Sequence, residues 1–198
     1  MEAQLEDVGS GLAPVSEGWF AVNTRDAAWL ANPAFGARCV FQADAPVLRD
    51  RPDLTERRFP DLGITLAVLE PGRPSGLYHA ESAQEDFLVL AGECVAIVED
   101  EERPLRQWDF LHCPAGTSHV FVGAGQGPCV LFMVGARTPG KSIVYPRSEV
   151  ALRQGAGVEE ETPSPQEAYG PFPRWQPGRP ASPEGLPWEG DWNVTTGR

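Results

Sequence analysis

Positive charge is scarce in this sequence. Lysine and arginine together number 16, against 28 aspartates and glutamates, so the formal net charge is −12. A protein that binds nucleic acid or an anionic membrane needs a basic surface that displaces the counterions of phosphate groups. The composition therefore argues against nucleic acid and anionic membranes as partners.

Long apolar runs are also missing. No segment approaches the ~20 consecutive apolar residues that a membrane-spanning helix needs. The N-terminal stretch MEAQLEDVGSG is acidic and lacks the order of a secretory signal, in which basic residues precede an apolar run. We therefore expect a cytoplasmic protein.

Closely spaced cysteines are absent too. Cys39, Cys94, Cys113 and Cys129 are far apart and form no C-x-x-C pair. They lie within apolar, strand-like segments, where a thiol behaves as a small buried hydrophobe. The pattern predicts four free buried thiols and no disulfide framework.

Short strand-like segments make up most of the chain between about residues 18 and 137. They recur every eight to twelve residues or so and alternate with Gly and Pro turns, which is typical of an antiparallel barrel or sandwich. GWFAVN, ARCVFQ, GITLAVLEPG and CVLFMVGAR are examples. One short helix is expected in TRDAAWLANP, capped by Thr24 or Asp26 and ended by Pro33. The predicted fold class is all-β, an antiparallel jelly-roll β-barrel with short helices.

The C-terminal part has a different composition. We divide the chain into an N-terminal segment 1–17, a β-barrel 18–150 and a Pro/Gly/Trp-rich arm 151–198. Proline at the density found in the arm prevents long helices and regular sheet. Either the arm is a disordered tail, or it is extended and docks through Trp175, Trp188 and Trp192. A short helix in TPSPQEAY would begin with Ser164 as cap and Pro165 in its first turn.

Two of the three histidines lie close to acidic residues in strand-like segments. Residues two apart on a strand share a face, so His79 and Glu81 point the same way, together with Leu77. Glu85 opens the next strand, shares its face with Phe87, and leaves Asp86 on the opposite face. Further on, PAGTSH makes a turn that leads His119 onto another strand.

These residues fall on two motifs that resemble those of the cupin family. The first motif is read as His79, Glu81, Glu85 and Gly92, and the second as Asp109, Pro114, Gly116, His119 and Gly123. The resemblance covers about residues 60 to 136. It implies a cupin barrel with a divalent metal ion, Fe, Mn or Zn, held by His79, Glu81, Glu85 and His119.

The sequence departs from the cupin motifs at three positions. Glu81 stands where the family has a second histidine, Trp108 where it has a glycine, and Gly123 where it has an asparagine. Glu81 makes the ligand set richer in oxygen, which favours iron, manganese or zinc over copper. One alternative is a triad of His79, Glu81 and His119, with Glu85 as a base beside it. The other is a cupin that has lost its metal, in which Glu81 and His79 form a buried pair.

The resemblance leaves the reaction open, because this barrel carries many chemistries. One hypothesis is a metalloenzyme, a dioxygenase or an isomerase, in which Glu81 and Glu85 move protons. Its substrate pocket is predicted to be lined by Leu77, Phe87, His112 and Phe121. Oxoglutarate-dependent chemistry is disfavoured, since no arginine follows His119 by about ten residues. The other hypothesis is a non-catalytic cupin that binds a metal or small ligand as a sensor. In either case we expect a homodimer, formed along an edge strand.

Overall fold

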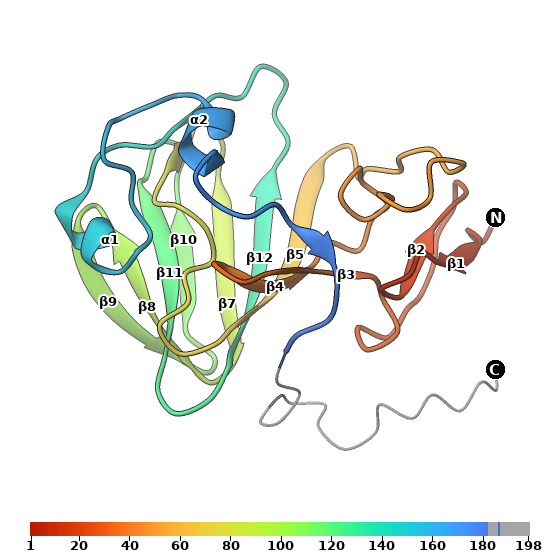
Figure 1. The fold of residues 1–198 in the computed structure, drawn as a ribbon, viewed down its shortest axis with the longest axis horizontal. Helices are drawn as coiled ribbons and strands as arrows, with labels where there is room; N and C mark the ends of the chain where they lie inside the picture. Colours follow the sequence, from red (N-terminus) through yellow and green to blue (C-terminus); the bar gives the residue numbers. More distant parts are fainter. Residues whose placement is uncertain (182–185, 187–198) are drawn as a thin grey trace.

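The fold is described from a computed structural model, in which residues 1–181 and 186 are placed (Figure 1). Among these residues, no helix is long and apolar enough to cross a membrane. The elements in chain order are β1 (Leu5–Asp7), β2 (Leu12–Pro14), β3 (Trp29–Asn32), β4 (Gly36–Cys39), β5 (Leu62–Leu69), β6 (Ala80–Glu81), β7 (Glu85–Ala91), β8 (Glu93–Val98), β9 (Glu101–Arg106), β10 (Phe110–Cys113), β11 (His119–Ala124), β12 (Cys129–Ala136), β13 (Ile143–Val144), α1 (Glu149–Arg153), α2 (Pro165–Tyr169) and β14 (Gln176–Pro177).

Two antiparallel sheets form the body of the protein. The larger has the order β10-β7-β12-β5-β4-β3-β14, and the smaller has the order β11-β8-β9 (Figure 1). The main core contains side chains from both sheets, including Phe87 and Leu131 from the large sheet and Ala96 and Phe121 from the small one. The predicted all-β jelly roll is confirmed, although its hydrogen bonds run in separate sheets and not around one closed barrel.

Strand β7 shows how the alternation of residues sets the faces of the large sheet. Phe87 and Val89 are buried in the main core, as their shared face predicts. Asp86 lies on the opposite face, where its carboxylate contacts His112 of β10 at 2.6 Å. The inner side of β7 is therefore the side that carries Glu85.

The helix predicted between Thr24 and Pro33 was wrong. The chain makes one turn there, in which the N–H groups of Asp26 and Ala27 both donate to Asn23 O, and then enters strand β3. Pairing with β4 and burial of Trp29 outweigh the local helix signals, because a helix would leave that large side chain without a core. GWFAVN is not a strand either, since Trp19 makes only a single bridge, to Glu2.

The described part of the C-terminal arm packs first against β8 and β11 of the smaller sheet, through Ala151 and Ala156, and then docks on the large sheet. Ser164 caps α2 by accepting from Glu167 N, and Pro165 is the first helical residue, as predicted. Strand β14 then pairs with β3 and covers that edge of the sheet. Trp175 stacks against Phe35, so the docking alternative is confirmed for this residue. Trp188 and Trp192 lie outside the described residues.

The four cysteines are free and buried, as predicted. Burial raises the pKa of the Cys39 thiol to about 11 and that of Cys113 to about 12, which keeps both thiols protonated at neutral pH. These side chains serve as small apolar packing groups.

Backbone conformation accounts for two of the departures from the cupin motifs. Trp108 has φ of 73°, a left-handed conformation that glycine adopts without strain and a bulky residue does not. At Gly123, an added Cβ would lie 2.3 Å from Glu70 O, so no larger residue fits there. The first departure therefore carries strain, while the second is required by the neighbouring backbone.

Candidate metal centre

Glu85 lies on the inner face of the large sheet. In the register of the strands it is opposite Cys113 of β10 on one side and Gly135 of β12 on the other. Its side chain is 16% exposed. The carboxyl group is thus directed into the space between the two sheets.

His119 approaches Glu85 from β11 of the smaller sheet, and His79 lies next to it just before β6. Their backbones form a bridge to each other, with His119 N donating to His79 O at 2.9 Å and His79 N donating to His119 O at 3.2 Å. Each imidazole also contacts a nearby carbonyl through Nδ1, Leu77 O at 2.7 Å for His79 and Thr117 O at 3.0 Å for His119. A ring that donates from Nδ1 carries its lone pair on Nε2.

Both Nε2 atoms face the same carboxylate oxygen. Oε2 of Glu85 is 3.4 Å from Nε2 of His119 and 3.9 Å from Nε2 of His79. This oxygen is buried and has no hydrogen-bond partner among the described residues. Three lone-pair donors that converge within 4.8 Å of one another require a cation or a proton between them. The three residues therefore fit a divalent metal ion, for which imidazole and carboxylate are ordinary ligands.

Electrostatics keeps the two imidazoles neutral. Burial lowers the pKa of His79, and the neighbouring charge of His119 lowers it further. Burial also lowers the pKa of His119. Burial raises the pKa of Glu85 to about 7, with a second contribution from the charge of Glu81. Neutral histidines are ready to bind a cation, whereas Glu85 must lose its proton first.

Glu81 lies beside this group but is engaged elsewhere. Its carboxylate forms an ion pair with the ammonium of Lys141, on the loop after β12. It does not belong to the group of three residues whose donor atoms converge. The buried Glu81–His79 pair that the metal-free alternative requires is not among the contacts of the described residues. Glu81 as a metal ligand or base stays a prediction.

Two of the four predicted pocket residues lie next to the triad. The rings of Phe87 and Phe121 are buried, with centroids 5.0 Å and 6.2 Å from that of His119. The other two require a correction. Leu77 packs in a separate apolar cluster with Phe35 and Tyr145. His112 lies on the outer face of the sheet, because alternation along β10 turns it away from the buried side of Cys113.

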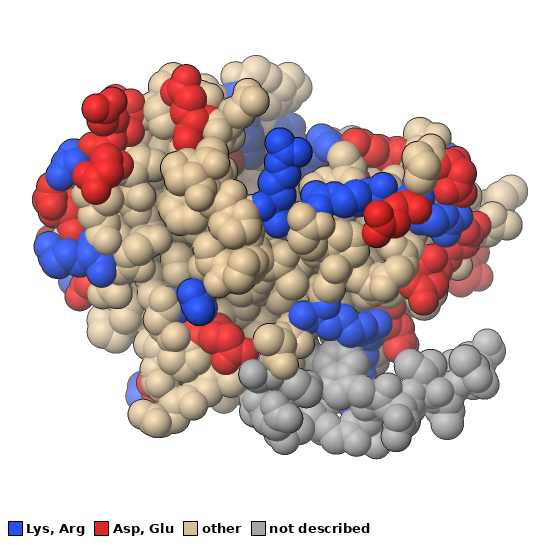
Figure 2. All heavy atoms as spheres, in the orientation of Figure 1, with Lys and Arg blue, Asp and Glu red and all other residues tan. Residues whose placement is uncertain are grey.

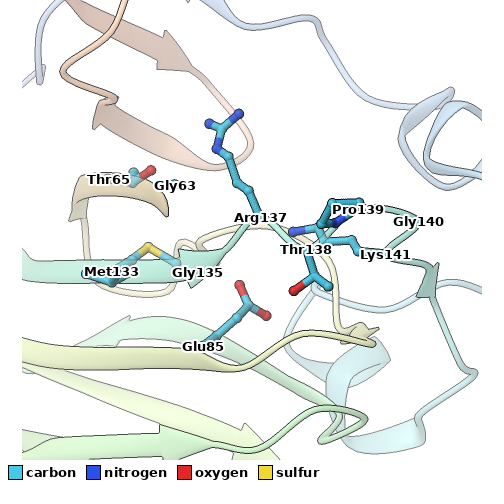
Figure 3. Close-up of a pocket in the computed structure, with 11 residues that line it drawn as sticks. Gly63, Thr65, Glu85, Met133, Gly135, Arg137, Thr138, Pro139, Gly140 and Lys141 are labelled. Carbon is cyan, nitrogen blue, oxygen red and sulfur yellow. The ribbon is translucent and has the colours of Figure 1, made fainter. Parts of the chain in front are cut away.

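A cavity of about 600 Å³ opens beside Glu85 (Figure 3). Glu85 from β7 and Thr138 from the loop after β12 point toward each other across it. Gly63 and Gly135 are directly paired on adjacent strands and both line the cavity. A Cβ at Gly135 would lie 3.3 Å from Oε1 of Glu85, so a side chain at this position would crowd the carboxylate. Arg137 and Lys141 also line the cavity.

Sequence reasoning missed three contributors to this region. Lys141 is the single lysine of the chain, a signal that was available. Tyr145 lies with its ring centroid 5.8 Å from that of His79, and nothing in its local sequence indicates this contact. Arg137 was not among the predicted site residues, and it lines the cavity without belonging to the group around Glu85.

Comparison with known proteins identifies the family. Residues 65–135 match the family model described as Cupin domain. The chain contains a cupin domain. The match begins in β5 and ends in β12, and it includes all three residues of the triad. The predicted resemblance to cupins is thereby confirmed.

The solved structures that are similar to this cupin domain carry names of different activities. A sugar phosphate isomerase from a cupin superfamily, from Silicibacter pomeroyi DSS-3, has 24% identity and a TM-score of 0.48, with 62% of this chain and 79% of that chain covered. The polyketide cyclase RemF from Streptomyces resistomycificus has 15% identity and a TM-score of 0.46, with 61% and 82% covered.

A third structure, from Acidithiobacillus ferrooxidans ATCC 23270, has 22% identity and a TM-score of 0.42. It is matched over 55% of this chain and 64% of its own length, so this chain spans less than two thirds of that protein. The search of curated proteins gives no match. At these TM-scores the likenesses carry no argument about the reaction.

Proposed function

We propose that this cupin domain binds one divalent metal ion through His79, Glu85 and His119 and acts on a small molecule in the adjacent cavity. The observation that carries the proposal is the buried Oε2 of Glu85, which lacks a hydrogen bond and faces two imidazole nitrogens. An unpaired buried carboxylate is costly, and a bound cation removes that cost. Iron, manganese and zinc suit two nitrogens and one oxygen.

Three protein ligands leave coordination positions for a substrate, and a metal bound there would supply Lewis-acid polarisation of a substrate oxygen. The surrounding residues have separate tasks. Glu85 links the metal ligands to the cavity, because it belongs to both. Phe87 and Phe121 exclude water behind His119. Arg137 and Lys141 provide positive charge at the cavity wall, which favours a substrate with oxygen-rich or acidic groups.

A non-catalytic binding role is the alternative, and one observation favours it. Neither predicted proton carrier would be free, because Glu81 is paired with Lys141 and Glu85 would be occupied as a metal ligand. A domain whose acids are all held would bind a ligand without turning it over. The homodimer and the cytoplasmic location also stay proposals.

Elemental analysis of protein purified without chelators tests metal binding. We expect one metal ion per chain in the wild type, and an affinity roughly 100-fold lower or worse in Glu85→Gln and His119→Ala, since each removes a ligand. His112→Ala is the matched control, because His112 is exposed and bonds only to Asp86. Full metal content in Glu85→Gln would remove Glu85 from the ligand set.

Turnover separates the enzyme from the binding module. The metal-loaded protein is incubated with small diketones, keto acids and sugars while oxygen consumption and product formation are followed. Turnover that is lost in His119→Ala supports the enzyme. Stoichiometric metal without turnover of any of these compounds favours the binding role.

A further inference from the structure

A second cavity, of about 390 Å³, lies under the C-terminal arm and shares no residue with the metal centre. Arg38 of β4, Arg49 and Arg174 line it, and none of its lining residues in the described part of the chain is an aspartate or glutamate. Figure 2 shows basic side chains gathered where the arm crosses the sheet near β14, while acidic side chains lie mainly toward the two ends of this view. In a chain with net charge −12 this is a local reversal of sign.

Arg38 is a half-buried cation at the wall of this cavity. Its Nε is buried and has no hydrogen-bond partner. Among the described residues it forms no ion pair, and its contact is with Trp175, whose ring centroid is 4.1 Å from the guanidinium carbon. The charge of Asp44 acts on Arg38 from a greater distance, while Oδ1 of Asp44 accepts from Val47 N. A partly desolvated guanidinium is stabilised by an anion in direct contact with it, and none of the described residues supplies one.

The walls of this cavity are held in place by other contacts. Arg49 donates to Trp175 O at 2.7 Å and to the side chain of Gln176, which ties the arm to the body of the protein. The hydroxyl of Tyr169 accepts from Leu77 N at 3.1 Å, so its own hydrogen is available as a donor. Ser75 offers a second hydroxyl at the cavity. The polar side chains that line the cavity are thus cations and hydroxyl donors.

We propose that this cavity binds the phosphate group of a small organic phosphate. A phosphate monoester carries close to two negative charges at neutral pH and several acceptor oxygens, which match several guanidinium groups better than one carboxylate does. The guanidinium carbon of Arg38 lies 4.1 Å from the centroid of the Trp175 ring, and a planar guanidinium can form such a bidentate contact. The aromatic side chains of Tyr169 and Trp175 provide an apolar wall for the organic part, and the volume is that of a small-molecule site.

Isothermal titration of the protein as purified with inorganic phosphate, at constant ionic strength, tests the site. We expect saturable binding by the wild type, at least tenfold weaker binding by Arg38→Met, and weaker binding by Arg174→Gln. Arg174 is exposed, so Arg174→Gln tests the site without changing a packed side chain. Arg103→Gln, on the distant strand β9, is the matched control and should bind like the wild type.

His119→Ala separates this site from the metal centre, since phosphate could also bind a metal ion. Unchanged phosphate binding in His119→Ala is expected. Loss of binding in that variant would overturn the proposal, and so would equal binding by wild type and Arg174→Gln, or no binding at all. Acetate that binds more tightly than phosphate would overturn the assignment of the ligand class.

Discussion

The metal centre and the arginine cavity are opposites built on the same principle. Each contains a charged side chain with one buried atom that has no hydrogen-bond partner among the described residues, Oε2 of Glu85 in one and Nε of Arg38 in the other. Around Glu85 the neighbours present lone pairs from two neutral imidazoles. Around Arg38 they present further guanidinium groups and hydroxyls. The first environment calls for a cation and the second for an anion.

The difference teaches that the sign of a missing ligand can be read from the neighbours of an orphaned charge. A buried charge alone shows only that its desolvation costs free energy. Neighbours of the same electrostatic sign show that the fold does not relieve this cost by itself. The following predictions test each half of the comparison, from the largest expected effect to the smallest.

The pH dependence of stability isolates the charge of Glu85. Its pKa is raised from 4.5 to about 7, which means that the folded state favours the protonated carboxyl group. The contribution of this group to the free energy of unfolding is therefore fully present below pH 4.5 and is lost as the pH rises through about 7. In metal-free protein, Glu85→Gln should therefore be more stable than the wild type by roughly 3 kcal/mol at pH 7.5, with the difference vanishing near pH 4.5. Urea unfolding with a chelator present, at several pH values, measures it. A constant difference across this range would contradict the assignment.

Removal of the other orphaned charge should also stabilise the fold. Arg38→Met keeps most of the side-chain volume and removes a half-buried cation that has no ion pair among the described residues. We therefore expect a gain of about 1–2 kcal/mol in the free energy of unfolding in phosphate-free buffer, even after the contact with Trp175 is lost. Thermal unfolding checks this. A clear loss of stability would mean that Arg38 is satisfied within the protein and would break the parallel with Glu85.

A Glu81 variant tests whether three protein ligands suffice to bind the metal ion. We expect Glu81→Gln to lower metal affinity about tenfold, because a nearby negative charge is lost and Lys141 is left without its partner. Glu85→Gln should cost far more. Competition with a chelator of known affinity gives both values, and Glu101→Gln, whose ion pair with Arg103 is exposed, is the control. Equal losses for Glu81→Gln and Glu85→Gln would make Glu81 a fourth ligand.

At Trp108 the unfavourable feature is backbone strain and not an unpaired charge. Trp108→Gly should stabilise the protein by up to about 1 kcal/mol, because φ of 73° suits glycine and the indole is 68% exposed. Gly123→Asn, the matching change at the other departure, should instead destabilise it, since Glu70 O occupies the space of its Cβ. Denaturant midpoints of the two variants give the comparison.

Local spacing was enough to predict much of this protein. Alternation along β7 correctly assigned the buried face of Phe87 and the opposite face of Asp86, and the Ser164-Pro165 pair correctly began a helix. His79, Glu85 and His119 were selected by motif spacing and lie together, because the strands that carry them are held in register by short turns.

Tertiary structure decided what depends on segments that are distant in sequence. Lys141 pairs with Glu81 across 60 residues, and the docked arm brings Trp175 onto Arg38. The same cause turned the segment after Thr24 into strand β3, since pairing with β4 and β14 outweighed its helix signals. Spacing fixes which face of a strand a residue takes, but only the packed chain determines what lies opposite that face, and therefore which charges are left for a ligand to neutralise.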